Sequence, residues 1–247
     1  MEEDLLKKRI MELRKRADFS CYPVFTDFLT LSEVQCAKNV LNGCKFQFFG
    51  GIADCERVML GIVSEEAALS EQDFPITCLR ISPKNRRFAE KLSHRDVLGS
   101  VLGLGLERSV IGDIFLKDTD AYLFCCERME SFLSEQLTQV RHTQVSCERF
   151  SLSEIAIERE FKEFTRSVAA VRMDAIAAAA FHVSRSTAAA DIPSGKLFLN
   201  GKEILSPSTL VKEGDVISYR GLGKVKLKTI GALTKKGRIS VTFLRYQ

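Results

Sequence analysis

Short apolar runs and helical periodicity follow one another in a regular order through the middle of the chain. Apolar runs at 76–81, 111–116, 121–125 and 143–150 predict strands, and apolar positions spaced by three or four residues over 93–103 and 128–137 predict helices. The resulting βαββαβ order is that of the ferredoxin-like fold. We therefore expect a ferredoxin-like central domain.

The pattern changes on the N-terminal side of this core. Residues 2–17 place Leu5, Leu6, Ile10 and Leu13 on one helical face, and a second helix is predicted over 32–41. Residues 1–43 are therefore expected to form an N-terminal helical region, and 44–150 the central domain. Residues 151–167 alternate in charge and predict a linker that ends as a strand.

The last third, residues 168–247, predicts a separate domain in which two helices pack on a small sheet. Apolar residues at helical spacing, among them Ile176 and Phe181, indicate the first helix, and Ser184 is placed to cap the second. Asn200-Gly201 is typical of a two-residue hairpin turn. Residues 224–228 alternate between lysine and apolar residues, so the lysines share one face. The expected fold class of the whole chain is α+β.

Positive charge is concentrated in this C-terminal domain. Residues 168–247 hold 13 Lys and Arg against 5 Asp and Glu, whereas the whole chain holds 36 against 32. A basic module of this kind is the electrostatic footprint of a nucleic-acid binder. Arg185 lies in the first turn of the second helix, where a cation opposes the helix dipole. The hydroxyls of Ser184, Ser186 and Thr187 surround the free backbone N–H groups at the start of that helix, and this combination suits a phosphate. A solvated arginine beside an ordinary serine cap is the alternative.

Further residues make this domain resemble the RNA-binding domain named after ribosomal protein S-four, also called the alpha-L motif. The resemblance is carried by Arg172-Met173-Asp174, Ser184-Arg185-Ser186, Ala188, Ile192, Gly195, Asn200-Gly201, Pro207, Val211 and Gly214-Asp215. It implies structured RNA held against the helix pair and the hairpin, and it departs at Thr187, where lysine is frequent. With the lysine-faced strand added, the RNA-binding candidates are Arg172, Ser184, Arg185, Ser186, Thr187, Lys196, Asn200, Gly201, Lys202, Lys224 and Lys226.

Motifs for catalysis or cofactor binding are weak. The eight cysteines form no C-x-x-C pair and only three histidines accompany them, so no zinc cluster is expected. His94-Arg95-Asp96 follows Ser93 as a helix-capping box, not as a kinase loop. Gly50-Gly51 lacks the Lys-Ser/Thr of a P-loop. We expect no catalytic residue, no metal and no cofactor.

An enzymatic alternative would have to use Asp96 or Asp113, and each carboxylate also has a capping or turn explanation. Gly99 and Gly103 lie four residues apart in a predicted helix, and they are expected to let that helix lie close to the sheet. RNA-recognition domains share the ferredoxin-like plan, but no aromatic pair follows their strand pattern here. Packing or ribosome docking is therefore as plausible for the central domain as base stacking.

A second resemblance spans about residues 45–247. Its motifs are Phe48-Phe49-Gly50-Gly51, Asp54, Glu56-Arg57, Leu92-Ser93-His94-Arg95-Asp96, Leu98-Gly99, Gly103-Leu104-Gly105, Arg108 and Gly112-Asp113-Ile114. Together with the C-terminal domain they resemble the bacterial YlmH-type RNA-binding proteins. The resemblance implies a cytoplasmic protein that associates with the large ribosomal subunit, binds ribosomal RNA and tRNA, and acts in rescue or quality control of stalled nascent chains. Some members are also tied to cell division.

These observations favour a non-enzymatic RNA-binding factor. We expect structured RNA, the large ribosomal subunit and no membrane as partners, and a monomer. An RNA-modifying enzyme that uses the C-terminal domain for targeting and a cell-division adaptor are the alternatives.

Overall fold

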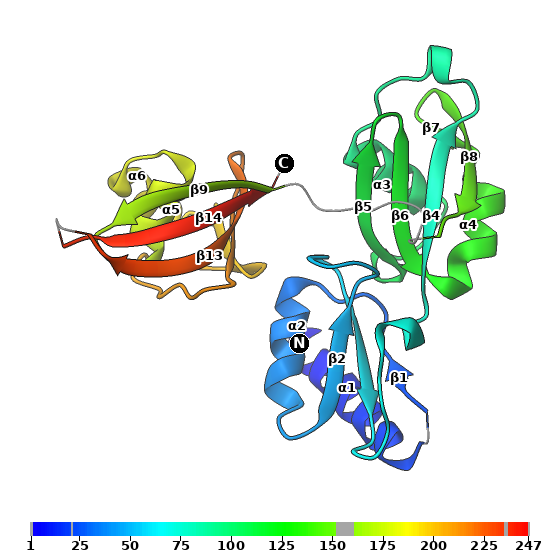
Figure 1. Cartoon of the computed structure of the whole chain (residues 1–247), viewed down its shortest axis with the longest axis horizontal. Helices are drawn as coiled ribbons and strands as arrows, with labels where there is room; N and C mark the ends of the chain where they lie inside the picture. Colours follow the sequence, from blue (N-terminus) through cyan, green and yellow to red (C-terminus); the bar gives the residue numbers. More distant parts are fainter. Residues whose placement is uncertain (1, 21, 152–160, 235–236, 247) are drawn as a thin grey trace. The chain divides into compact units, whose positions relative to one another are not determined.

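Helices and strands of the chain gather into two units, residues 1–158 and 159–247, and many of their elements are labelled in Figure 1. The structure is a computed structural model, and it describes residues 2–20, 22–151, 161–234 and 237–246.

The first part of unit 1 is a three-stranded antiparallel sheet covered by two helices. Helices α1 (Glu2–Phe19) and α2 (Leu31–Val40) lie against strands ordered β1 (Val24–Phe25), β3 (Met59–Val63) and β2 (Lys45–Phe49). Ile10, Ala37, Leu60 and Ile62 form the centre of the core between them. All five residues of β3 are buried, because its other face packs on the second part of the unit.

The second part of unit 1 has the expected ferredoxin-like topology. Strands β4 (Ile76–Pro83), β5 (Ile111–Lys117), β6 (Asp120–Cys126) and β8 (Thr143–Arg149) pair antiparallel in the order β5-β6-β4-β8, and the short β7 (Gln139–Val140) extends the edge. Helices α3 (His94–Gly103) and α4 (Glu130–Gln136) supply Val97, Val101 and Leu133 to its core. Short 3-10 turns occupy Glu71–Asp73, Arg86–Phe88, Arg108–Val110 and Glu127–Met129.

Unit 2 is a six-stranded antiparallel sheet with two helices on one face (Figure 1). The strand order is β11-β10-β12-β13-β14-β9. The helices α5 (Met173–Phe181) and α6 (Arg185–Asp191) meet Val225, Leu227 and Phe243 of the sheet in a core that excludes solvent. The strands are β9 (Phe161–Val168), β10 (Leu197–Leu199), β11 (Lys202–Glu203), β12 (Val216–Tyr219), β13 (Gly223–Leu233) and β14 (Ile239–Tyr246). The α+β fold class, with N-terminal helices, is thus confirmed.

Strand pairing differs from the expected domain boundaries in two places. The strands β2 and β3 fall inside the predicted 44–150 domain, yet they pair with β1 in the N-terminal layer. The strand expected at the end of the 151–167 linker is present as β9, but it belongs to the sheet of unit 2, where it pairs with β14 from Val168 to Phe161. Residues 152–160 of that linker lie outside the described part of the chain.

The sequence pattern of β9 shows little apolar alternation, because charged residues occupy some of its core-facing positions. Phe164 stacks on Phe243 with ring centroids 5.3 Å apart, and the guanidinium groups of Arg166 and Arg245 lie 5.3 and 5.4 Å from the Phe164 ring centroid. Arginine can lie over an aromatic face while it keeps contact with water. An edge strand built in this way lacks the apolar alternation that sequence patterns detect.

Glycines bring elements close together, but not at the expected positions. A Cβ at Gly99 or Gly103 would meet nothing within 4 Å, so the expectation that they bring the helix close to the sheet is wrong. The close approaches are at Gly112, where a Cβ would lie 2.8 Å from the Phe28 ring and 2.9 Å from Phe124, and at Gly51, where it would lie 2.2 Å from the Phe124 ring. Gly51 also has φ +106°.

We predict that Gly112→Ala destabilises the protein by about 1–3 kcal/mol, because the new methyl group must displace the buried Phe28 ring and the Cβ of Phe124. The matched control is Gly99→Ala on the exposed side of α3, which should stabilise by about 0.5–1 kcal/mol because the helix loses a flexible residue. Urea unfolding followed by circular dichroism measures both changes. Equal midpoints for the two variants would contradict the packing described for Gly112.

Candidate nucleic-acid interface

The turn between α5 and α6 gathers three hydroxyl groups. His182 ends α5 in the left-handed conformation at φ +59°, and Ser184 caps α6 by accepting a hydrogen bond from the Thr187 N–H at 2.9 Å. The Ser184 hydroxyl also lies 2.8 Å from that of Ser186 and 2.7 Å from that of Thr187. Because Ser184 already serves the helix start, charged side chains must supply most of the attraction for a phosphate here.

A buried carboxylate holds the two candidate arginines beside this turn. Asp174 is 5% exposed and accepts hydrogen bonds from the Arg185 Nε at 2.8 Å and from the Ala175 N–H at 3.0 Å. The Arg172 Nε lies 3.5 Å from the same carboxylate. The side chains of Arg172 and Arg185 remain 41% and 52% exposed. The Asp174 carboxylate thus forms a hydrogen bond with Arg185 and an ion pair with Arg172, whose Nε is buried without a hydrogen-bond partner, and the cluster keeps a net positive charge.

Lys196 lies in a second cluster, at the other end of α6. Its Nζ lies 2.8 Å from the Asp191 carboxylate, which also accepts a hydrogen bond from the Tyr219 hydroxyl at 2.5 Å. The hydrogen bonds from Lys196 and Tyr219 hold the pKa of Asp191 below its ordinary value. Burial, together with the Asp191 carboxylate, raises the pKa of Tyr219 to about 12.

A shallow groove of about 450 Å³ adjoins this second cluster. Thr187 and Lys196 both line it, and Arg220 lines it as well. The groove therefore connects the predicted RNA-binding residues Thr187 and Lys196 with Arg220, which was not among the predicted residues. Its lining residues are Val183, Thr187, Asp191, Ser194, Lys196, Tyr219, Arg220, Gly221 and Leu222.

The hairpin residues divide into positioning and exposed groups. Asn200 and Gly201 take φ +50° and +79°, as a tight turn between β10 and β11 requires. The Asn200 amide donates to Asp215 at 2.8 Å and accepts from the Val216 N–H at 2.9 Å. Both ends of this amide therefore hold the hairpin against the loop before β12. Lys202 is exposed on the hairpin itself.

Lys224 and Lys226 lie on the other face of the sheet. They alternate along β13 with Val225 and Leu227, which are fully buried under α5 and α6. Side chains of successive strand residues point to opposite faces, so the two lysines face away from the helix pair. The structure therefore brings Arg172, Ser184, Arg185, Ser186 and Thr187 together, joins Lys196 through the groove, and separates Lys224 and Lys226 from them.

Four motif residues of unit 1, Glu56, Arg57, Arg108 and Asp113, meet in one polar cluster that ties its two sheets together. The Asp113 carboxylate accepts the backbone N–H groups of Glu56 at 2.7 Å and Arg57 at 3.2 Å. The Arg57 guanidinium donates to the carbonyls of Phe28 and Ile111 at 2.9 Å each. Burial lowers the pKa of Arg57, and burial with the nearby Arg57 charge lowers the pKa of Arg108 to about 10.

The two carboxylates that an enzyme would have to use have structural roles in this arrangement. Asp113 holds the β2–β3 loop, and Asp96 completes the predicted capping box, with its side chain accepting the Ser93 N–H at 2.9 Å. Within the described residues, no group of three or more His, Cys, Asp or Glu could hold a metal ion. In the same part of the chain, no helix is long and apolar enough to cross a bilayer.

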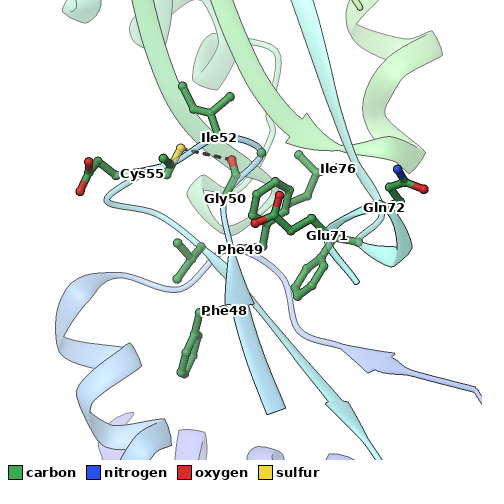
Figure 2. Close-up of a pocket in the computed structure, with 13 residues that line it drawn as sticks. Phe48, Phe49, Gly50, Ile52, Cys55, Glu71, Gln72 and Ile76 are labelled. Carbon is green, nitrogen blue, oxygen red and sulfur yellow. Dashed lines mark hydrogen bonds between the residues drawn. The ribbon is translucent and has the colours of Figure 1, made fainter. Parts of the chain in front are cut away.

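A cleft of about 790 Å³ adjoins the Gly50-Gly51 loop, and Figure 2 shows its apolar wall of Phe48, Phe49 and Ile52. Cys55 donates a hydrogen bond to the Gly50 carbonyl at 3.4 Å beside it. The charged residues of the lining are Asp54 and Glu71, so the cleft has the wrong charge for a phosphate.

The ferredoxin-like sheet also offers no stacking surface at its two central aromatic side chains. Tyr122 is 2% exposed and Phe124 is 0% exposed. The Phe150 ring covers Tyr122 with centroids 5.0 Å apart, and Phe115 packs on Phe124 at 5.8 Å. Base stacking requires an accessible ring face.

Comparisons with known proteins agree with this organisation. The model described as a putative RNA-binding domain in YlmH matches residues 70–154, and the model described as the S4 domain matches residues 171–217. The ribosome-associated protein quality control protein P2 of Bacillus subtilis (strain 168) is 33% identical over 229 residues, which cover 89% of this chain and 86% of that protein.

A solved structure is also similar to this chain. The cell division protein ylmH from Streptococcus pneumoniae has a TM-score of 0.52 and 24% identity, and the match covers 62% of this chain and 94% of that chain. This likeness supports the fold.

The Asp191 cluster gives a prediction for its titration. We predict that Lys196→Met raises the pKa of Asp191 toward its ordinary value, because the largest stabiliser of the carboxylate is lost. A carboxylate with a lowered pKa stabilises the fold above its unfolded pKa, and this contribution disappears as the pH falls through the folded value. Carbon-13 NMR titration of the Asp carboxyl groups measures the shift. Lys202→Met is the control, and an unchanged Asp191 titration in Lys196→Met would refute the ion pair.

Proposed function

Because this chain belongs to the YlmH family, we propose that it is a non-enzymatic RNA-binding factor that associates with the large ribosomal subunit. It carries two RNA-binding domain types and is homologous to a ribosome-associated quality control protein. The finer role is contact with ribosomal RNA and tRNA during the rescue of stalled nascent chains. Association with ribosomes would place it in the cytoplasm, and we propose that it acts as a monomer.

The observation that carries this proposal is the pair of guanidinium groups fixed by Asp174. Arg172 and Arg185 are held in place before any ligand arrives, yet each keeps about half of its surface open. Guanidinium groups donate in a planar fork that matches phosphate oxygens. A preorganised pair of this kind loses little side-chain entropy on binding. Its fixed geometry favours an RNA whose phosphates are held in a defined arrangement over a flexible RNA strand.

Two further features support RNA as the ligand of this surface. The hydroxyls of Ser186 and Thr187 lie beside the arginines, and hydroxyl groups commonly contact phosphate and sugar oxygens. The groove continues the surface to Lys196 and Arg220. We propose that the contacts run from Arg172 through the α5–α6 turn to Lys196, with Lys202 at the hairpin. Asn200 and Gly201 act by positioning that hairpin.

The non-enzymatic proposal is supported by the structural roles of Asp96 and Asp113, the carboxylates named for the enzymatic alternative, since both accept backbone hydrogen bonds within the fold. Mapping of modified nucleosides, after incubation with bulk tRNA and ribosomal RNA, tests it directly, and any new product would overturn the non-enzymatic proposal. A cell-division adaptor would remain in the supernatant when purified large subunits are pelleted at low salt.

We predict that Arg185→Ala with Lys196→Ala weakens binding to tRNA and to large subunits. Each lost phosphate contact should lower the slope of log affinity against log salt by about one unit, so the double variant should lose about two. Filter binding between 50 and 200 mM salt, over which the Debye length falls to about half, measures this slope.

The control for this experiment removes two exposed lysines from unit 1, Lys91→Ala with Lys117→Ala, and so changes the net charge equally. It should keep the parent slope. Thermal unfolding of each variant confirms that the fold is intact. An Arg185/Lys196 variant with the parent's affinity and salt slope would exclude this surface as the binding site.

A further inference from the structure

The open face of the C-terminal sheet carries aromatic rings and lysines in one row. Pairing between strands sets Phe198 of β10 beside Ser218 of β12, and Ser218 beside Lys224 of β13. The Lys224 Nζ lies 5.5 Å from the centroid of the Tyr246 ring on β14. Tyr246 in turn pairs with Phe161 of β9, and their ring centroids are 5.1 Å apart.

A second row beside the first adds cations and one aliphatic side chain. Lys226 pairs with Leu244, and Leu244 pairs with Glu163. Lys228 follows on the same strand at a register shift and lies 2.6 Å from Glu163. At the far end of the first row, the Arg220 guanidinium lies 5.5 Å from the centroid of the Phe198 ring. Basic groups therefore lie over two of the three rings, Phe198 and Tyr246, and the acidic residues of this face are Glu203, which pairs with Phe198, and Glu163, which is bound by Lys228.

The rings remain accessible. Phe161, Phe198 and Tyr246 are all partly exposed, in contrast to Tyr122 and Phe124 of the ferredoxin-like sheet, which are buried. Neighbouring strands lie about 4.8 Å apart, so Phe198 and Tyr246, three strands apart, are separated by about 14 Å. Ser218 and Lys224 fill the interval between them.

We propose that this face binds single-stranded RNA as a second surface, apart from the α5–α6 surface. Rings on a sheet stack with unpaired bases, and lysines beside them contact the backbone phosphates. Like charges aligned on one sheet face repel each other, and a polyanion relieves that repulsion. Tyr246, Phe161 and Phe198 are the stacking residues, and Lys224 and Lys226 the phosphate contacts.

The proposal is independent of the α5–α6 surface, because the buried residues Val225, Leu227 and Phe243 separate the two faces. A rigid phosphate pattern suits the fixed arginines of the helix side. An unpaired strand suits the rings, since duplex bases offer no free faces. The same domain would then bind a structured element and an adjoining unpaired segment.

The test uses the full chain and a fluorescent 12-residue oligouridylate, with anisotropy as the readout. Tyr246→Leu with Phe161→Leu removes two rings and keeps apolar volume, and we expect at least tenfold weaker binding from a stacking energy of about 1–3 kcal/mol per base. The control is Phe19→Leu with Tyr22→Leu, which removes the same two ring types from exposed positions in unit 1. It should leave the affinity within twofold.

The lysines are tested separately. Lys224→Met with Lys226→Met should lower the salt slope for oligouridylate by about 1.4 units, since each contact on a single strand contributes about 0.7. Arg185→Ala with Lys196→Ala should keep the oligouridylate affinity within twofold, whichever way it affects tRNA. Circular dichroism of each variant checks that the sheet is intact.

Three results would overturn the proposal. The first is an unchanged oligouridylate affinity in the Tyr246/Phe161 variant, which means that the rings do not stack. The second is a loss of oligouridylate affinity in the Arg185/Lys196 variant equal to that in the Tyr246/Phe161 variant, which means that the two faces do not form separate sites. The third is competition by oligoglutamate at the concentration effective for unlabelled oligouridylate, which assigns the face to acidic peptides.

Discussion

The alternation of side chains along β13 governs what unit 2 can do. A strand has two faces, and burial of Val225 and Leu227 under α5 and α6 forces Lys224 and Lys226 to the opposite side. Burial of apolar surface stabilises a fold by about 25 cal/mol per Å², so the helices cover the apolar face of the sheet. A shift of register by one residue would bury the lysines and expose the apolar residues, which is strongly unfavourable. The two-faced distribution of charge is therefore a consequence of core formation. The predicted basic residues on the helix side, Arg172, Arg185 and Lys196, accordingly lie at helix ends and in a loop.

Buried or partly buried carboxylates build that helix-side surface. Asp174 and Asp191 each face two side chains that carry donors, and each lies at one end of a short helix. An isolated buried carboxylate is strongly unfavourable, so Asp174 requires its arginines. The arginines, however, do not require Asp174 for solvation, because about half of each side chain faces water. Asp174 thus orients the two arginine side chains but neutralises only part of their positive charge, and a phosphate can approach them from the solvent-exposed side.

The order of elements was accessible from sequence, and the partnerships across elements were not. The βαββαβ order and the helix pair follow from local periodicity and capping residues, which short windows of sequence contain. The pairing of Asp174 with Arg185 spans 11 residues and that of Asp191 with Tyr219 spans 28. Such contacts depend on how the helices settle on the sheet. The sequence does contain one signal for the Arg172–Asp174 ion pair, since the two residues lie only two positions apart in the motif.

The glycines show the same limit in another form. Gly99 and Gly103 have the spacing of a close helix contact, but that spacing does not say which face of the helix meets the sheet. Gly51 and Gly112 have no periodic signal, and both lie against Phe124, whose position depends on strand pairing. Sequence reading can identify a residue that permits close approach, but the tertiary fold decides whether an approach occurs.

The ferredoxin-like sheet of unit 1 and the sheet of unit 2 differ in the exposure of their aromatic side chains. In unit 1, Phe124 is 0% exposed because Gly51, Gly112 and Phe28 close over it, which joins the N-terminal layer to the ferredoxin-like sheet. The rings there are used for cohesion, and a base could reach them only by disrupting the core. In unit 2 the helices occupy one face only, so Tyr246 and Phe161 contact each other and keep part of their surface open. The ferredoxin-like sheet therefore presents no accessible ring face at Tyr122 or Phe124, whereas the sheet of unit 2 leaves its rings partly exposed on the face without helices.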